Sequence, residues 1–354
     1  MVLVAALSSC TVVKTDAPAK EISFMVARHS SATKADPADY KDGYRNVPFG
    51  TYAWYKALDE SDNTEYFANR EVGYQEDGNR WITVGKTYYW PSTGTLDFIS
   101  YSPYSVDGID APAPVITENA INYSTPWNVN DHQGVDVMYA DKAVGLNRNL
   151  NTFNHGYQGV PTLFRHALAR LAFRIRTGII SNTDASGETT RWEIDIHSLT
   201  LKDIFTTGTL TLNLGEDGDW AKPESNAWTP TDETVDRPVS VEGITTLNLD
   251  DQILPESFFV LPQTLENQIL EVVATIRTYR DRNDGTGEQL IITEEDVVGS
   301  APLAVEDIDT WGINQFITYI ITVNPIIDKE DSIILFDPAV VGWDERVVGT
   351  TLTL

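Results

Sequence analysis

Hydrophobic and polar residues alternate with a period of two along much of the chain, most clearly within residues 160–178, VPTLFRHALARLAFRIRTG. The second part of this segment sets apolar side chains against mostly arginine side chains: Leu171, Phe173 and Ile175 alternate with Ala172, Arg174 and Arg176. This alternation predicts a strand with one buried and one solvated face. In the first part, Phe164, Leu168 and Leu171 also satisfy helical spacing, so a helical turn or a bulge near His166 is an alternative.

The same pattern predicts strands on both sides of this segment. Towards the N-terminus, strands are expected at residues 21–27, 49–55, 65–74, 80–84, 96–101 and 135–141. The stretch 105–134 is rich in Pro, Asn and Asp and is expected to be an irregular loop. Towards the C-terminus, alternation runs from 191 to 214, and strands are expected at 257–262, 269–280, 289–293, 315–324 and 332–336. Asn283-Asp284-Gly285 is a turn signal that would join two of these strands in a hairpin. Because no helical pattern of three turns is present, the predicted fold class is all-β, with two sandwiches.

Charge changes abruptly at the end of the 160–178 segment. Residues 1–178 hold 16 Lys and Arg against 19 Asp and Glu, a net charge of −3, whereas residues 179–354 hold 9 against 33, a net charge of −24. A chain of 354 residues suits two domains of ordinary size. We therefore expect an N-terminal signal and linker at 1–20, an N-terminal domain at 21–178 and an acidic C-terminal domain at 179–354.

Composition excludes several classes of function. A formal net charge of −27 argues against nucleic acid as a partner, because phosphate contacts need clustered Lys and Arg. It favours a self-repelling surface that works in salt or outside the cell. No stretch approaches 18 apolar residues, so no segment is predicted to cross a membrane as a helix. A single cysteine rules out an internal disulfide and a cysteine-based zinc site.

That single cysteine closes the N-terminal run MVLVAALSSC. The four residues Leu7-Ser8-Ser9-Cys10 are similar to a bacterial lipobox, although the run lacks a positive region and a full-length apolar core. If the similarity holds, Cys10 carries acyl chains such as palmitate, and the protein is anchored to the outer membrane at the cell surface. The alternative is an apolar N-terminal strand with an incidental cysteine.

No motif for catalysis stands out, and neither an enzyme, a cofactor nor a metal is predicted. Glu193, Asp195 and His197 share one face of a strand, but a solvated face explains them better than a metal site. The stretch from Asp281 begins like a calcium loop, yet its twelfth position is Ile292 where a bidentate Glu is needed. The abundance of 52 acidic residues makes chance carboxylate pairs uninformative.

Nine Trp and 15 Tyr residues suggest a second class of function. Aromatic side chains on a β-sandwich can bind sugars by stacking, although most of them lie in alternating strands and are expected to pack in a core. Trp127, Trp220 and Trp228 lie in polar stretches and are the candidates for ligand contact. The alternative function is therefore a surface-anchored, glycan-binding lipoprotein that does not polymerise.

Several motifs follow one another in an order that resembles the fimbrillin-like family, the type V pilus subunits of Bacteroidales. They are the lipobox, EISF, FGTYAWY, YYWPSTGTLDFISYSPY, FRHALARLAFRI and ITYIITVNPII followed by ILFDPAVVGWDE. The resemblance implies two transthyretin-like β-sandwich domains in tandem. It also implies an exported lipoprotein precursor that is trimmed by a protease after its first strand and polymerised into an adhesive fimbria by β-strand exchange. The implied partners are other pilus subunits and a host or bacterial surface receptor or glycan.

The resemblance also assigns roles to particular residues. Ile22, Phe24 and Val26 of the first strand would fill a groove in the precursor. Lys34 before Ala35 occupies the place of the family's cleavage site; because the usual residue there is Arg, Arg28 and Arg45 are alternatives. The C-terminal segment VVGTTLTL, with Val347, Leu352 and Leu354, is the candidate donor strand, unless it closes its own sandwich.

Overall fold

The computed structural model describes residues 20–28, 44–78, 80–105, 112–148, 159–213, 227–231, 233–306, 308–325 and 344–353. Within these ranges nearly all regular structure is β-strand, and the two helical elements are single 3-10 turns, η1 Tyr44–Asn46 and η2 Glu76–Gly78. The predicted all-β class is thereby confirmed. No helix in the described ranges is long and apolar enough to cross a membrane.

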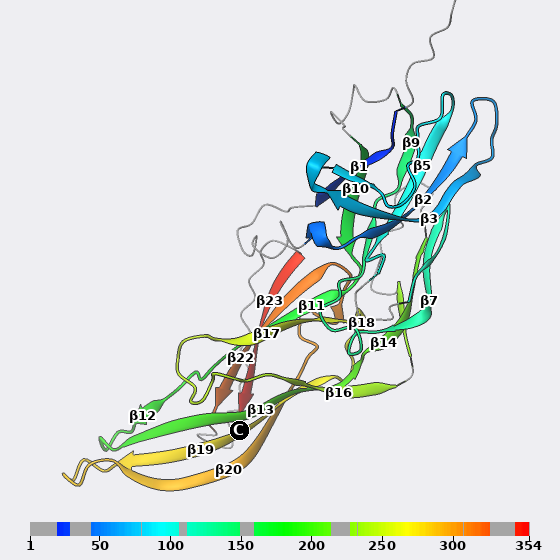
Figure 1. Ribbon diagram of the computed structural model, residues 1–354. Coiled ribbons are helices and arrows are strands. Elements are labelled where there is room, and N and C mark those ends of the chain that lie inside the picture. Colours follow the sequence, from blue (N-terminus) through cyan, green and yellow to red (C-terminus); the bar gives the residue numbers. More distant parts are fainter. Residues whose placement is uncertain are drawn as a thin grey trace, which may run out of the picture.

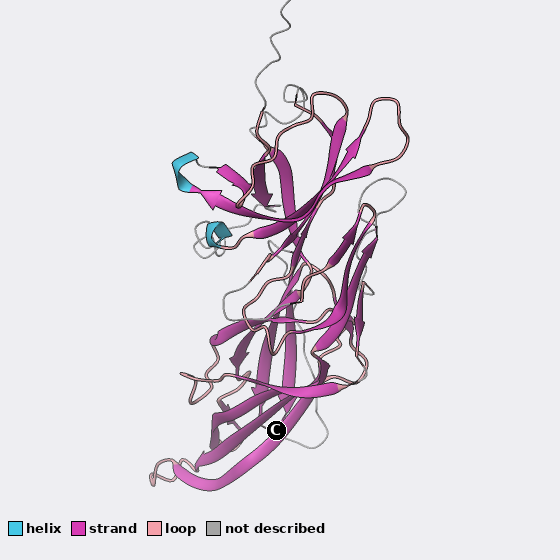
Figure 2. Cartoon of the chain, turned by 45° about the vertical axis from the view of Figure 1, so that its right-hand side comes forward, coloured by secondary structure: helices cyan, strands magenta, loops and turns pink. Residues whose placement is uncertain are grey.

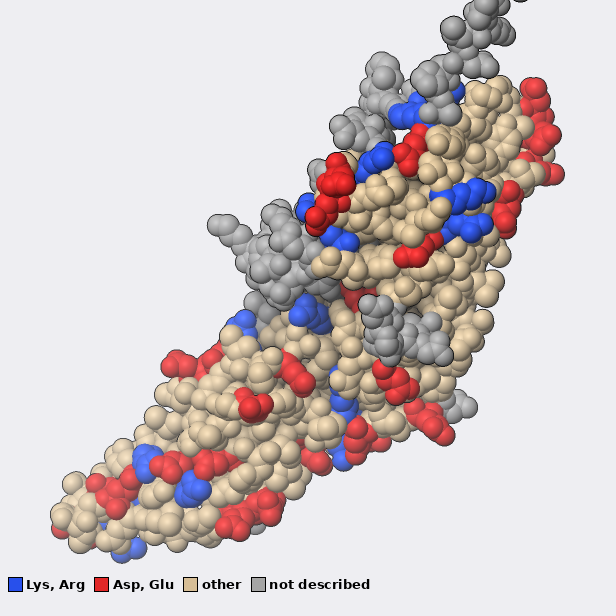
Figure 3. Space-filling view, viewed as in Figure 1, with Lys and Arg blue, Asp and Glu red and all other residues tan. Residues whose placement is uncertain are grey.

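The molecule is elongated, with a ring of strands at one end and a two-sheet sandwich at the other (Figure 1, Figure 2). A small third sheet, which contains β7 and β14, lies beside the junction (Figure 1). Acidic and basic side chains are interspersed over both ends on the face shown in Figure 3.

At the N-terminal end, a sheet closes on itself. The hydrogen-bonded order is β2-β3-β4-β1-β10-β8-β5, and β5 pairs again with β2, so seven strands form a ring to which β9 is added at β5. These strands are β1 Ser23–Arg28, β2 Phe49–Lys56, β3 Thr64–Gln75, β4 Arg80–Thr83, β5 Thr95–Ser102, β8 Met138–Ala140, β9 Ala143–Leu146 and β10 Val160–His166. A two-sheet sandwich is the sequence-based expectation here. The pairing of β1 with both β4 and β10, and of β5 with both β8 and β2, joins the layers into a ring instead.

The interior of the ring is filled by the alternating apolar side chains of its strands. Aromatic rings dominate: Phe49 lies 5.6 Å from Phe24, 5.5 Å from Trp81 and 5.3 Å from Phe164, measured between ring centroids. Most of these pairs meet edge to face, the arrangement that the charge distribution of aromatic rings favours. The ring is therefore a packed core and not an open channel.

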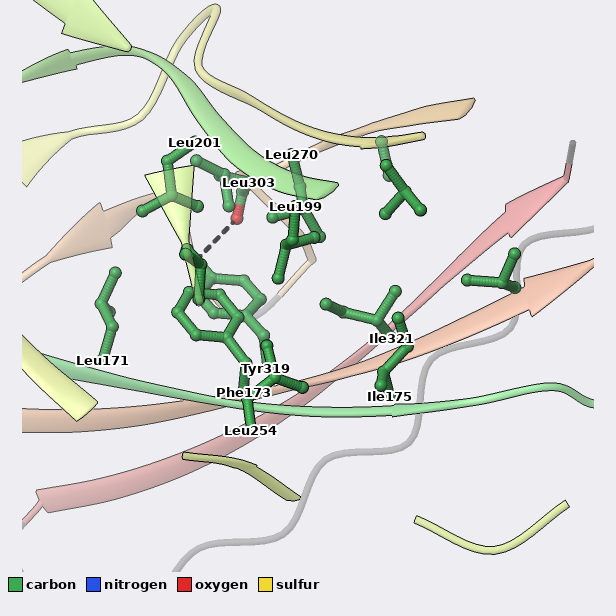
Figure 4. Packing of buried hydrophobic residues seen from close by; sticks show 14 of the residues in the cluster. Leu171, Phe173, Ile175, Leu199, Leu201, Leu254, Leu270, Leu303, Tyr319 and Ile321 are labelled. Carbon is green, nitrogen blue, oxygen red and sulfur yellow. Dashed lines mark hydrogen bonds between the residues drawn. The ribbon is translucent and has the colours of Figure 1, made fainter. Parts of the chain in front are cut away.

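The C-terminal end is a sandwich of two sheets. One sheet has the order β17-β11-β22-β23, and the other has the order β12-β13-β19-β20 with β16 paired to β13. Their strands are β11 Ala169–Arg176, β12 Ser181–Thr183, β13 Thr189–Phe205, β16 Thr234–Val239, β17 Gln252–Val260, β19 Ile269–Asp281, β20 Gln289–Pro302, β22 Gln315–Asn324 and β23 Asp344–Thr353. Between the sheets, the Phe173 ring stacks on Tyr319, whose hydroxyl donates to the Leu303 carbonyl at 3.0 Å (Figure 4). Burial raises the pKa of Tyr319, so the hydroxyl stays protonated and remains a donor.

Strands from both halves of the chain build the third sheet. Its order is β15-β14-β7-β6, with β6 Val115–Thr117, β7 Ala120–Asn128, β14 Thr207–Asn213 and β15 Trp228–Pro230. A two-stranded sheet, β18 Gln263–Thr264 with β21 Thr310–Trp311, lies in the C-terminal half. The third sheet covers its own apolar cluster, which includes residues from position 54 to position 313 and so links the two ends.

The 160–178 segment is two strands in two different sheets. β10 belongs to the ring and β11 to the sandwich, and Ala167 and Leu168 lie between them. Neither the helical turn nor the bulge offered near His166 is found, because Ala167 and Leu168 form a bend between two separate strands. β11 packs in the C-terminal core, so the change of core falls before Ala169 and not after Gly178. The division of the chain at 178 therefore assigns β11 to the half in which it does not pack.

Residues 105–134 differ from the expected irregular loop, because β6 and β7 lie within them. The sequence pattern fails here because Pro126 interrupts the alternation of β7. The register against β14 shifts between Gly208 and Leu210, so Pro126 lies where the ladder is already irregular. The expected strand at 332–336 lies outside the described residues.

Candidate strand-exchange site

The first strand, β1, completes the ring between β4 and β10. It runs parallel to β10 over five residue pairs, from Phe24 opposite Val160 to Arg28 opposite Phe164. On its other side it pairs antiparallel with β4 at two positions, Ser23 with Ile82 and Phe24 with Trp81. If β1 left, the ring would open, and the facing edges of β4 and β10 would lose their partner.

The side chains of this segment point into the ring core. Ile22 is 0% exposed and Phe24 is 3% exposed, whereas Val26 is half-buried. The Phe24 ring meets Phe49 and Phe98 edge to face, with centroids 5.6 and 5.8 Å away. Full burial of side chains of this size contributes about 1.5–3 kcal/mol each. Ile22 and Phe24 therefore provide most of the free energy from apolar burial that keeps β1 docked.

Contacts just before β1 hold the segment in register. The Ile22 amide donates to the Tyr88 carbonyl, and the Trp90 amide donates to the Lys20 carbonyl, both at 2.9 Å. Glu21 pairs with Arg80 at 2.8 Å, but exposed ion pairs of this kind contribute about 0–1 kcal/mol. This end of β1 is therefore stabilised mainly by backbone hydrogen bonds and by burial of apolar side chains.

Gly159 allows β10 to approach β1. A Cβ at this position would lie 2.7 Å from the Ser23 carbonyl oxygen, closer than side-chain carbons come to backbone atoms. The sequence pattern does not reveal the role of Gly159. The only signal available was a glycine directly before an alternating segment, which does not say which strand passes beside it.

The candidate cleavage residues differ in their setting. Lys34 lies outside the described residues. Arg28 is the last residue of β1 and pairs with Phe164 of β10, so a protease would first have to peel it from the sheet. Arg45 is exposed in η1, with its guanidinium carbon 4.7 Å from the centre of the Tyr74 ring.

The candidate donor segment forms an edge strand of its own sandwich. β23 runs parallel to β22 over ten residue pairs, from Asp344 opposite Gln315 to Thr353 opposite Asn324. Val347 is opposite Thr318 and Leu352 is opposite Val323, whereas Leu354 lies outside the described residues. Within a single chain, this matches the alternative that the segment closes its own sandwich, and donation to another subunit would require β23 to leave β22.

Two of the three candidate ligand tryptophans are buried, so predicting them as exposed ligand contacts was wrong. Trp127 is 1% exposed and stacks on His132 with ring centres 4.2 Å apart. Trp228 is 2% exposed, and its indole N–H donates to the Ala167 carbonyl at 2.6 Å. Polar neighbours in sequence hid the fact that β7 and β15 turn these rings into the cluster under the third sheet. Trp220 and Cys10 lie outside the described residues.

The charged face of β13 is an ion-pair network. Arg191 donates to Glu193 at 2.8 Å, and this hydrogen bond is the main reason that the pKa of Glu193 is lowered. Arg277 contacts Asp195 at 2.6 Å, and the His197 Nε2 lies 2.7 Å from the Thr275 hydroxyl. In the described ranges, no group of three His, Cys, Asp or Glu side chains is placed to hold a metal. The geometry here is that of a solvated, charge-paired surface.

Several known proteins are similar to this chain over most of its length. Solved structures similar to this chain include a candidate cell adhesion protein from Bacteroides uniformis ATCC 8492, with 16% identity, 94% of this chain and 98% of that chain covered, and a TM-score of 0.46. A second candidate cell adhesion protein, from Bacteroides eggerthii DSM 20697, has 9% identity, coverage of 95% and 98%, and a TM-score of 0.41. A fimbrial protein from Bacteroides ovatus ATCC 8483 has 9% identity, coverage of 85% and 48%, and a TM-score of 0.31. No curated protein matches the sequence. The model of the fimbrillin-like family matches residues 33–343, most of the chain, and the protein belongs to the fimbrillin-like family.

Proposed function

We propose that this chain is a structural and adhesive pilus subunit that polymerises by exchange of its first strand. Membership of the fimbrillin-like family supports a role in a cell-surface appendage and not in catalysis. The observation that carries the proposal is the position of β1. An N-terminal strand completes the ring between β4 and β10 and buries Ile22 and Phe24.

The covalent connectivity makes this strand removable. Residues 29–43 join β1 to η1, so a cut within them leaves β1 held by non-covalent contacts alone. Lys34 is the favoured site, because Arg28 is paired within the sheet. Loss of β1 would expose backbone groups of β4 and β10 and the apolar slots of Ile22, Phe24 and Val26, which is the kind of groove that a strand from another chain can fill.

The incoming strand comes from the C-terminal segment of another subunit. The segment from Val347 to Leu354 is rich in β-branched residues. Its described part, 347–353, lies at the edge of its sheet, where departure breaks only the ladder with β22. Until β1 is removed, the groove is filled, which keeps the precursor monomeric. Acylation of Cys10 would tether the exported precursor to the outer membrane, and the assembled fimbria would present the receptor-binding or glycan-binding surface.

Limited trypsin digestion of the full chain tests the proposal. Cutting within residues 29–43, located by mass spectrometry, is expected to convert monomers into oligomers in light scattering. Lys34→Gln should slow the conversion, and Arg45→Gln serves as the matched control that should not.

Deletion of residues 347–354 separates donor from acceptor. The cut, truncated chain should stay monomeric but bind a synthetic VVGTTLTL peptide. If it still polymerises, the donor is another segment; if the cut full-length chain stays monomeric, strand exchange through the β1 groove is rejected.

A further inference from the structure

β20 is the outermost strand of its sheet. β23 of the other sheet approaches part of it, but no strand in the described part of the chain pairs with its outer edge. Only β19 pairs with it there. The eight consecutive residues from 289 to 296 are all exposed, so this part of the strand lacks cover on either face as well as along its outer edge. It lies at the end of the molecule opposite the ring (Figure 1). Natural proteins usually shorten, charge or cover such edges, because unpaired backbone groups attract other strands.

The side chains along this edge are apolar. Leu290 is 53% exposed, Ile291 is 53% exposed and Ile292 is 48% exposed. Gln289 and Thr293 flank them, so five consecutive residues carry no charge. The two isoleucines favour strand structure, and all three side chains are apolar and exposed. This composition is typical of a strand edge that pairs with another strand.

A bulge and three carboxylates mark the C-terminal limit of this site. The register of β20 against β19 shifts at Ile291, between the partners of Tyr279 and Thr278. It shifts again between the partners of Ile276 and Ala274, where Asp296 has a φ of 52°, and the segment with apolar exposed side chains ends before this second bulge. Glu294, Glu295 and Asp296 form no ion pair with any described residue. By contrast, Arg191 matches the charges of Glu193 and Glu288 on the same sheet.

We propose that the free edge of β20, residues 289–293, is a docking site for an extended protein segment that is apolar in its middle and carries Lys or Arg at its ends. The backbone of the segment would continue the sheet beyond β20, and its apolar side chains would cover Leu290, Ile291 and Ile292. Its basic ends would provide ion-pair partners for Glu294, Glu295 and Asp296. This site is separate from the β1 groove and is present while β1 is still in place.

A second copy of β20 fits this edge poorly. In a parallel, in-register pair, Glu294, Glu295 and Asp296 would lie beside their own copies. In an antiparallel pair centred on Ile291, Glu294 would face Glu288 of the other copy. Glu288 already shares Arg191 with a second carboxylate, Glu193, and pairs with no other basic side chain in the described ranges. Like charges placed opposite each other destabilise a strand pair, so a basic partner is favoured over self-association.

Peptide binding to the full-length, uncut chain tests this inference. The probe is Lys-Lys-Thr-Val-Ile-Val-Thr-Lys-Lys, and the control peptide has Glu in place of every Lys. We expect the basic probe to bind at least about tenfold more tightly than the acidic control, and raising the salt to about 0.5 M should weaken the difference. Hydrogen exchange should show new protection at residues 289–293.

Two substitutions to lysine on the same strand give the decisive comparison. Ile291→Lys puts a charge in the middle of the edge and is expected to weaken the probe at least about tenfold. Val298→Lys adds the same charge beyond the second bulge, at a residue that is 57% exposed, and should leave binding unchanged.

Equal binding of both peptides, or equal effects of the two variants, would overturn the proposal. Concentration-dependent dimerisation that Ile291→Lys abolishes would also overturn it, because the occupant would then be a second copy. None of these outcomes depends on cleavage near Lys34, so the proposed function is tested separately.

Discussion

At the scale of single residues, burial of β1 depends on few side chains. Alternation in the sequence places Ile22, Phe24 and Val26 on one face, and the structure buries the first two and half-buries the third. Their neighbours in space could not be predicted. Phe24 packs against Phe49 and Phe98, which are 25 and 74 positions later in the chain, and alternation carries no information about which strands meet.

Phe24→Ala should loosen β1 without unfolding the sandwich. Removing a buried phenylalanine ring costs about 3–5 kcal/mol, although the measured loss cannot exceed the free energy with which β1 docks. We expect faster hydrogen exchange at residues 24–28 and 160–164 and unchanged exchange where β13 pairs with β19. Met25→Ala, at a residue that is 36% exposed, is the control and should change neither. Equal acceleration in both variants would show that Phe24 does not hold β1.

At the scale of elements, the junction between β10 and β11 sets the architecture. The sequence shows one alternating segment there, but Ala167 and Leu168 separate a ring strand from a sandwich strand. Long strands with clean alternation, such as β13, β19 and β22, were predictable. β7 was not, because Pro126 and a bulge interrupt it. The burial of Trp127 and Trp228 was missed for the same reason, since their own strands are short or irregular and only distant strands cover them.

Trp228 ties the third sheet to this junction, and its hydrogen bond can be isolated. Trp228→Phe removes the donor to the buried Ala167 carbonyl and is expected to lower the free energy of unfolding by about 1–3 kcal/mol beyond the loss of packing. Trp127→Phe is the matched control, because Trp127 is buried in the same cluster and its indole nitrogen has no partner among the described residues. Chemical denaturation measures both. If the two variants lose the same stability, the Trp228 hydrogen bond makes no separate contribution.

At the scale of the whole molecule, ion pairs and like-charge repulsion act in opposite directions. The sandwich carries ion pairs between Arg or Lys and carboxylates, among them Arg191 with Glu288 and Lys202 with Asp236. Exposed pairs contribute about 0–1 kcal/mol each. From β11 onward, residues 169–354 hold only 12 basic against 33 acidic residues, so even if every basic residue is paired with one carboxylate, 21 carboxylates are left over.

Salt separates the two effects, because it screens both. If the ion pairs dominate, adding salt at pH 7 lowers stability; if repulsion among the excess carboxylates dominates, adding salt raises it. The excess of carboxylates leads us to expect that raising sodium chloride from about 0.02 M to 0.3 M increases the melting temperature. Glu294 and Glu295 form no ion pair with any described residue. Replacing both with Gln should therefore raise the melting temperature at low salt and reduce its dependence on salt. Glu288→Gln is the opposing control, since it removes one of the two carboxylate partners of Arg191 and should not stabilise the protein. A melting temperature that falls with salt would mean that the paired charges, and not the excess, determine the electrostatic stability of the sandwich.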